Sequence, residues 1–131
     1  MSKAADLAKF IGTGLAGKVI QTQKTVVTAT NTTTLTTNTV VDITDLSVNI
    51  TPKFSNSIIF LTGQVFGEPS LNGPHNMMFL FRRGTTDLKG TVASSRTVGI
   101  VAPFLSYYDA DQASTPDSVV LHFHDEPSST S

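Results

Sequence analysis

Short strand-forming runs of apolar and β-branched residues divide most of this 131-residue chain, and within residues 41–50 apolar and polar residues alternate with a period of two, as in strands that bury one face. Turn-forming Gly, Pro, Asn and Asp separate the runs at intervals of about 8 to 12 residues, which predicts roughly eight antiparallel strands in a sandwich or barrel. Of these two architectures we expect the sandwich, so the predicted fold is all-β: an antiparallel, jelly-roll-like β-sandwich. The expected strands occupy residues 18–28, 39–43, 46–50, 57–67, 77–82, 85–89, 97–109 with a break at Pro103, and 118–124.

Two details of the pattern predict where a sheet breaks and where the core lies. The alternation through Val41 and Ile43 changes phase at Thr44 and Asp45, which predicts a bulge or a break between two short strands. Residues 57–67 form the most apolar run, so we expect this strand to have apolar residues on both faces and to lie at the centre of the core. The four successive apolar residues are Ile58, Ile59, Phe60 and Leu61.

Residues 25–41 carry no charge, and about half of them are Thr. Thr is β-branched, which disfavours a helix and suits a strand that faces solvent. We therefore expect a strand, an exposed Asn/Thr turn within 30–38, and a second strand. The chain has 20 Thr and 13 Ser against 9 basic and 10 acidic residues, so hydroxyl groups rather than charges hydrate the expected surface.

The first 17 residues differ from the rest because their apolar residues have helical spacing. Ser2 is a candidate N-cap for a short helix over residues 2–11. We expect this helix, or an extended arm in its place, to anchor the chain to another protein, while residues 18–131 form the β-sandwich. The candidate anchoring residues are Leu7, Phe10 and Ile11.

Three glycines follow the expected helix and spell G-x-G-x-x-G at Gly12, Gly14 and Gly17. A nucleotide-binding turn of this spelling needs a strand before the glycines and a helix after them. The order here is reversed, so we interpret the glycines as a joint between the helix and the first strand. No cofactor is expected.

Charge and composition narrow the classes of partner. The formal net charge of −1 provides no broad field toward nucleic acid or an anionic membrane, so we expect neither partner. No run approaches the ~18 apolar residues of a membrane helix, and the N-terminus, with Asp6 and Lys9, lacks the apolar core of a secretory signal. The chain has no Cys, which excludes disulfides, thiolate catalysis and Cys-ligated zinc.

His122 and His124 are the candidate metal ligands. Residues i and i+2 of a strand share a face, so the two imidazoles lie together. Two nitrogens seldom hold a metal, but three chains on one axis would bring six, a set suited to iron or nickel. The simpler interpretation, which we favour, is that Phe123 faces the core while both imidazoles face water.

The segment FLFRR, residues 79–83, combines aromatic and basic residues, as some nucleic-acid surfaces do. Phe79 and Phe81 share one face of the expected strand, so we interpret them as core residues with Arg82 and Arg83 at the strand exit.

Acidic residues gather in the C-terminal third, where they could form a carboxylate pair or bind calcium. Their spacing matches no calcium loop, and we interpret them as solvated turn residues. No Ser-His-acid set can be assembled from the spacing, so we expect no enzyme. The acidic residues are Asp109, Asp111, Asp117, Asp125 and Glu126.

The residues now described resemble a family of small tail-fibre-like virion proteins of marine and freshwater bacteriophages. The resemblance rests on "SKAADLAKFIGTGLAGKVIQ", "DITDLSVNITPKFSNSIIFLTGQV", "FRRGTTDLKG" and "HFHDEPSST" and covers nearly the whole chain. Some phage fibres bind iron through H-x-H motifs on a threefold axis. Members of the family continue beyond the "DEPSSTS" turn with a further hairpin, so we expect this β-sandwich to lack its last hairpin.

The resemblance implies a virion structural protein, part of a tail appendage, that is made in the host cytoplasm and assembles as a homotrimer. It implies contacts with other tail or capsid proteins through residues 1–17, and contact with the host surface, where a glycan is the expected partner. Two alternatives stay open: a capsid decoration protein on the major capsid protein, and a glycan-binding or glycan-cleaving module. The resemblance attaches no catalytic residue to the pattern.

Overall fold

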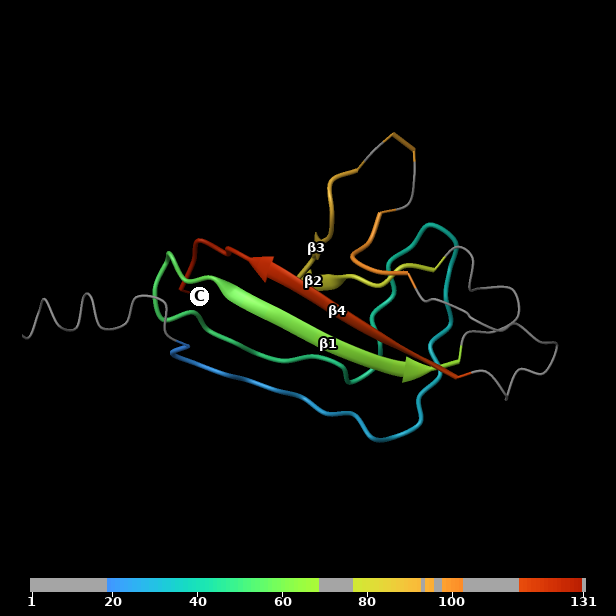
Figure 1. Cartoon of the computed structure of the whole chain (residues 1–131). Helices are drawn as coiled ribbons and strands as arrows, with labels where there is room; N and C mark the ends of the chain where they lie inside the picture. The colour runs from blue at the N-terminus through green and yellow to red at the C-terminus, as the bar shows by residue number, and fades with distance from the viewer. Residues whose placement is uncertain (1–18, 69–76, 93, 96–97, 103–115, 131) are drawn as a thin grey trace, which may run out of the picture. The chain divides into compact units, whose positions relative to one another are not determined.

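A computed structural model of the chain describes residues 19–68, 77–92, 94–95, 98–102 and 116–130. Contacts divide the chain into two compact units, Met1–Ile50 and Thr51–Ser131. In the described residues all regular structure is β-strand and belongs to the second unit (Figure 1). The strands are β1 (Ile59–Gly67), β2 (Phe81–Arg83), β3 (Thr86–Leu88) and β4 (Asp117–Asp125). The expected N-terminal helix, its anchoring residues Leu7, Phe10 and Ile11, and the three glycines lie outside the described residues.

β1 and β4 form an antiparallel two-stranded sheet, seen as the two long arrows in Figure 1. The register places Ile59 opposite Asp125 and Gly67 opposite Asp117, so all nine residues of each strand are paired without a bulge. β-Branched and aromatic residues favour this pleated conformation in both strands. The strands expected over 57–67 and 118–124 are thus confirmed, with bounds shifted by one or two residues.

The core lies on one face of this sheet, which we call the inner face. Val119 and Leu121 of β4 and Leu88 of β3 are 7%, 4% and 7% exposed, and they are the only buried apolar residues in the described parts of the chain. On the opposite face of β1, Phe60 and Phe66 are 59% and 72% exposed. The strand does carry apolar residues on both faces, but the expectation that both faces lie in the core is wrong, because the described parts of the second unit leave the opposite face exposed.

Gly63 of β1 lies where β2 packs on the inner face. A Cβ atom at this position would lie 3.2 Å from Leu121 Cδ2 and 3.2 Å from Phe81 Cε1. These separations are tighter than ordinary van der Waals contact, so the Phe81 ring sits close only because Gly63 has no side chain. Phe81 therefore faces the core, as its place in FLFRR predicts.

Gly63→Ala is expected to lower the free energy of unfolding by about 1 kcal/mol, since the Phe81 ring and Leu121 must move to admit the methyl group. Gly67→Ala is the matched control in the same strand, because a methyl group there would meet no other atom within 4 Å. It should leave stability unchanged or raise it by up to about 1 kcal/mol. Urea unfolding of both variants measures the difference, and equal effects would show that Phe81 does not pack at Gly63.

β2 and β3 form a short antiparallel hairpin that pairs Phe81 with Leu88 and Arg83 with Thr86. Gly84, the first residue of the two-residue turn, has φ of 57°, as a type II′ turn requires and as Gly adopts without strain. The tight turn predicted at Arg83 and Gly84 is confirmed one residue further along, at Gly84 and Thr85.

Arg82 and Asp87 face each other across this hairpin and form an ion pair of 3.1 Å. The hydrogen bond from Arg82 lowers the pKa of Asp87 below its ordinary value of 3.8; Lys89, 3.4 Å away, lowers it further, while desolvation opposes both. A carboxylate with a lowered folded-state pKa stabilises the fold above its unfolded pKa.

The contribution of Asp87 should therefore be complete at neutral pH and be lost as pH falls through 3.8 toward the lower folded-state pKa. Unfolding free energies of the wild type and Asp87→Asn, measured from neutral to acidic pH, should converge in that window. A difference that stays constant through the window would contradict this assignment.

Phe79 and Val101 form an isolated antiparallel bridge. The Phe79 amide donates to the Val101 carbonyl at 2.8 Å, and the Ile100 amide donates to the Phe79 carbonyl at 2.8 Å. Within the expected strand 97–109, this bridge is the only β pairing in described residues 98–102, and residues 103–115 lie outside the described ranges.

Residues 19–58 form no strand, although their composition predicts three. Three turns interrupt this segment, closed by hydrogen bonds from the Thr39 amide to the Thr36 carbonyl, from Leu46 to Ile43 and from Ser57 to Phe54. In the first two turns, Asn38 and Asp45 occupy the third position with φ of 56° and 62°. The predicted turn within 30–38 and the predicted break at Thr44 and Asp45 are confirmed. The expected strands 18–28, 39–43 and 46–50 are wrong for the single chain, because β propensity supplies no pairing partner.

Candidate functional site

The candidate site is the face of the β1–β4 sheet opposite the core, which we call the outer face. Side chains alternate between the two faces of a strand, so the burial of Val119 and Leu121 directs their neighbours outward. All eight outer-face residues are exposed, and none carries a formal charge with His neutral. They form the cross-strand pairs Phe60 with His124, Thr62 with His122, Gln64 with Val120, and Phe66 with Ser118.

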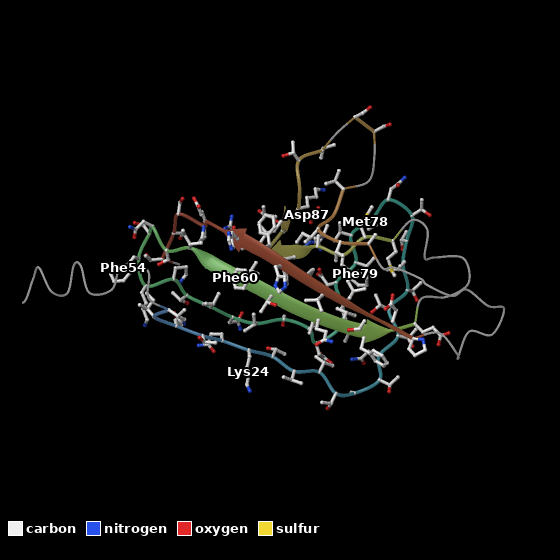
Figure 2. All side chains as sticks on the ribbon, viewed as in Figure 1. Lys24, Phe54, Phe60, Met78, Phe79 and Asp87 are labelled. Carbon is white, nitrogen blue, oxygen red and sulfur yellow. The ribbon has the colours of Figure 1, made fainter. Side chains whose placement is uncertain are left out.

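Three rings form a cluster at one end of the outer face. The His122 imidazole stacks on the Phe60 ring at 5.6 Å between centroids and 11° between planes. The His124 imidazole meets the same ring edge-on at 5.2 Å and 60°. Figure 2 labels Phe60 on the β1–β4 sheet. Ring pairs in these geometries stabilise by about 0.5–1.5 kcal/mol each, so Phe60 positions both imidazoles.

The other half of the outer face carries hydrogen-bonding groups. Gln64 Nε2 donates to Ser118 Oγ at 2.8 Å across the two strands. The Ser118 amide in turn donates to Asp117 Oδ1 at 2.7 Å, which fixes the start of β4. The outer face thus combines an exposed aromatic ring with hydroxyl, amide and imidazole groups, a mixture able to contact both the apolar and the polar parts of a ligand.

His122 and His124 lie on the exposed outer face, and Phe123 points to the inner face, as the interpretation favoured from sequence predicts. Within the described residues, no group of three or more His, Cys, Asp or Glu side chains could hold a metal ion. The described part of one chain therefore offers two imidazoles to a metal, and three chains on one axis would complete an octahedral set.

The basic residues of FLFRR are both engaged in ion pairs. Arg82 binds Asp87, and Arg83 Nη1 donates to both carboxylate oxygens of Asp125 at 2.8 and 2.7 Å. This second pair joins the β2–β3 hairpin to the end of β4. The segment consequently presents no unpaired guanidinium for a phosphate backbone.

Asp125 is 6% exposed, so the expectation that it is a solvated turn residue is wrong. Its place opposite Ile59 and its pairing with Arg83 bury it. Asp117 lies at the other end of β4, about 26 Å away at the rise of an extended strand. Paired glycosidase carboxylates are about 5 to 9.5 Å apart, so these two cannot form such a pair. Asp109 and Asp111 lie outside the described residues.

Sequence reasoning missed Phe60 as the partner of the histidines and Arg83 as the partner of Asp125. Both contacts depend on strands brought together from distant parts of the chain, and period-two alternation identifies a face without identifying its neighbour. The only local signal was the high aromatic content of residues 57–67.

No helix in the described part of the chain has the length and apolar character needed to cross a membrane. Comparison of the chain with models of protein families, with curated proteins and with solved structures found no match.

Proposed function

We propose that this chain is a non-enzymatic structural protein of a bacteriophage particle, a homotrimeric component of a tail-fibre-like appendage located in the virion. In the assembled state its strands complete a jelly-roll-like β-sandwich, and residues 1–17 anchor it to another virion protein. The family resemblance of the sequence motifs supports this assignment.

The observation that carries the proposal is that residues 19–50 are mostly exposed and belong to no strand. This segment has the composition of strands, yet none of its residues is buried and none forms a strand in the single chain. Val19 and Val26 are 86% and 71% exposed. A chain that leaves so much β-prone, weakly charged sequence without a core gains its stability by assembly, as the repeated parts of a particle do.

Quantitative mass spectrometry of purified particles tests the proposal. We expect the chain in the particle at a small multiple of three copies. Hundreds of copies would instead assign it to the alternative structural role, decoration of the major capsid protein. Absence from purified particles would refute both virion roles.

Deletion of residues 1–16 tests the anchor. The truncated chain should remain folded and trimeric in circular dichroism and sedimentation, yet fail to enter particles. A truncated chain that still enters particles would show that the attachment lies elsewhere.

The outer face supports a second candidate function, binding of a host-surface glycan. Aromatic rings pack on the apolar faces of sugar rings, while neighbouring amides and hydroxyls bond their hydroxyl groups, and Phe60 is surrounded by such groups. The absence of formal charge on this face suits a neutral oligosaccharide.

Binding of labelled host polysaccharide to the purified protein tests this function. Phe60→Ala should weaken binding about tenfold or more, a loss of about 1.4 kcal/mol. Phe54→Ala is the control, because Phe54 is 50% exposed but lies in the Phe54–Ser57 turn outside the outer face, and it should bind as the wild type does. Equal binding by the wild type and Phe60→Ala would exclude the outer face as a glycan site.

A further inference from the structure

We propose that residues 19–50 of one copy pair as strands with a free edge of the β1–β4 sheet in a second copy of this chain. The inference deepens the proposed trimeric assembly and rests on it. It names the donor segment, the acceptor edge and the partner.

The donor segment, residues 19–50, has a strand-forming sequence but no buried side chain. Disordered segments have low hydrophobicity and high charge, whereas residues 19–50 carry only Lys24, Asp42 and Asp45 and are rich in Val, Ile and Thr. Figure 2 shows the Lys24 side chain extending away from this segment. Ordering a backbone costs about 1–2 kcal/mol per residue, and with no buried side chain the single chain has little to offset that cost.

A few local hydrogen bonds order the donor segment, but they do not form the backbone hydrogen-bond ladder of a β-sheet. The two turns, at Thr36–Thr39 and Ile43–Leu46, are closed by backbone hydrogen bonds. Thr25 Oγ1 donates to the Ser47 carbonyl at 2.5 Å, which brings two extended stretches together at one point. No residue between these contacts belongs to a strand in the described chain, and backbone amides and carbonyls need hydrogen-bond partners, which a neighbouring strand would supply.

The acceptor is the β1–β4 sheet, which has only two strands in the described parts of the chain and therefore two free edges there. Soluble proteins protect such edges with Lys, Pro, bulges or short strands. β1 and β4 are nine residues long, pair without a bulge, and contain no Lys, Arg or Pro. Edges of this kind need a covering strand.

The described residues thus include both a strand-forming segment that belongs to no sheet and a sheet edge without Lys, Arg, Pro or a bulge, which makes copies of the chain complementary to one another. Donation from each copy to the next is a head-to-tail contact, which gives a ring where the rotation between copies closes and an open filament where it does not. Closure after three copies gives the proposed trimer. The donor has a single positive charge and two negative ones, so pairing of copies brings little like-charge repulsion.

Hydrogen exchange across a dilution series of the full-length protein, with sedimentation on the same samples, tests the inference. At high concentration, amides in residues 19–50 and the amides of β1 and β4 that point away from their own sheet should be protected. On dilution to monomer, both sets should lose protection together, because the donor and the edge belong to different copies.

Thr28→Pro removes an amide from the donor, at a residue without a backbone hydrogen bond in the described single chain. It should raise the midpoint concentration of assembly about tenfold or more, a change of about 1.4 kcal/mol. Thr37→Pro is the control, since Pro is favoured at the second position of the Thr36–Thr39 turn. Its midpoint should match that of the wild type.

Three results would overturn the inference. Protection that persists in the monomer would show pairing within one chain. An oligomer with unprotected residues 19–50 would show that the copies meet elsewhere. Protection gained only on mixing with particles that lack this chain would assign the donor to another virion protein. In the last two cases the chain can still be found in particles, so this inference fails separately from the proposed function.

Discussion

Replacing Leu121 with Ala is expected to lower the free energy of unfolding by about 3 kcal/mol. Leu121 is 4% exposed, the lowest value among the three buried apolar residues of the described chain, and it lies at the centre of β4 opposite Gly63. Truncation removes apolar contacts and leaves a cavity between β4 and the Phe81 ring. Because so few residues form this core, the loss has a large effect on the second unit.

Val120→Ala is the matched control for Leu121→Ala. Val120 is the preceding residue of the same strand, but it is 50% exposed on the outer face. Its truncation should cost no more than about 0.5 kcal/mol, as for most surface positions. Both values can be measured by urea unfolding at one protein concentration. A reversed order would mean that β4 turns its other face to the core, as a one-residue slip of register would produce.

Arg83→Met is expected to lower the free energy of unfolding by about 2 kcal/mol. The substitution leaves the Asp125 carboxylate, whose side chain is 8% exposed, without the guanidinium that donates two hydrogen bonds to it. The Arg83 side chain is 44% exposed, so solvent screening keeps the expected loss below that of a fully buried pair.

A double substitution separates the ion pair from general damage to the hairpin. Arg83→Met combined with Asp125→Leu removes both charges, and should recover at least half of the stability lost by Arg83→Met alone. Arg82→Met is the control for a pair whose carboxylate is more exposed, since the Asp87 side chain is 24% exposed, and it should cost about 1 kcal/mol or less. A double variant less stable than Arg83→Met would show that Asp125 stabilises the fold through other contacts.

Local sequence signals were sufficient for the elements of the second unit. The apolar run of residues 57–67 predicted β1, the strand-forming run of residues 118–124 predicted β4, and the Arg-Gly turn predicted the β2–β3 hairpin, because each depends on neighbouring residues only. The phase change at Thr44 and Asp45 correctly predicted a break, since a period-two pattern cannot slip without one. These signals establish antiparallel β structure, and the sandwich stays a proposal.

Pairing across the sequence could not be predicted from the same signals. The face that Phe60 shares with His122 and His124 exists because β1 and β4 pair, and alternation alone does not select that partner. Asp125 follows an apolar strand and precedes Pro127, which indicates a solvated turn. Only the approach of Arg83 from another hairpin explains its burial.

Residues 19–50 are a case in which local signals predicted strands that the single chain does not form. Their Val, Ile and Thr content predicted strands, but a strand exists only in a ladder, and composition does not say which chain completes it. The exposed side chains of this segment, and the edges of the β1–β4 sheet that no described strand covers, are therefore the features that connect the fold to the proposed assembly.

A density map of the purified particle, with this chain located by a labelled fusion at its C-terminus, tests the central claim most directly. The account predicts the label at a tail appendage, in groups of three around an axis. A label spread over the capsid lattice would contradict the appendage, and particles without any label would contradict a virion role altogether.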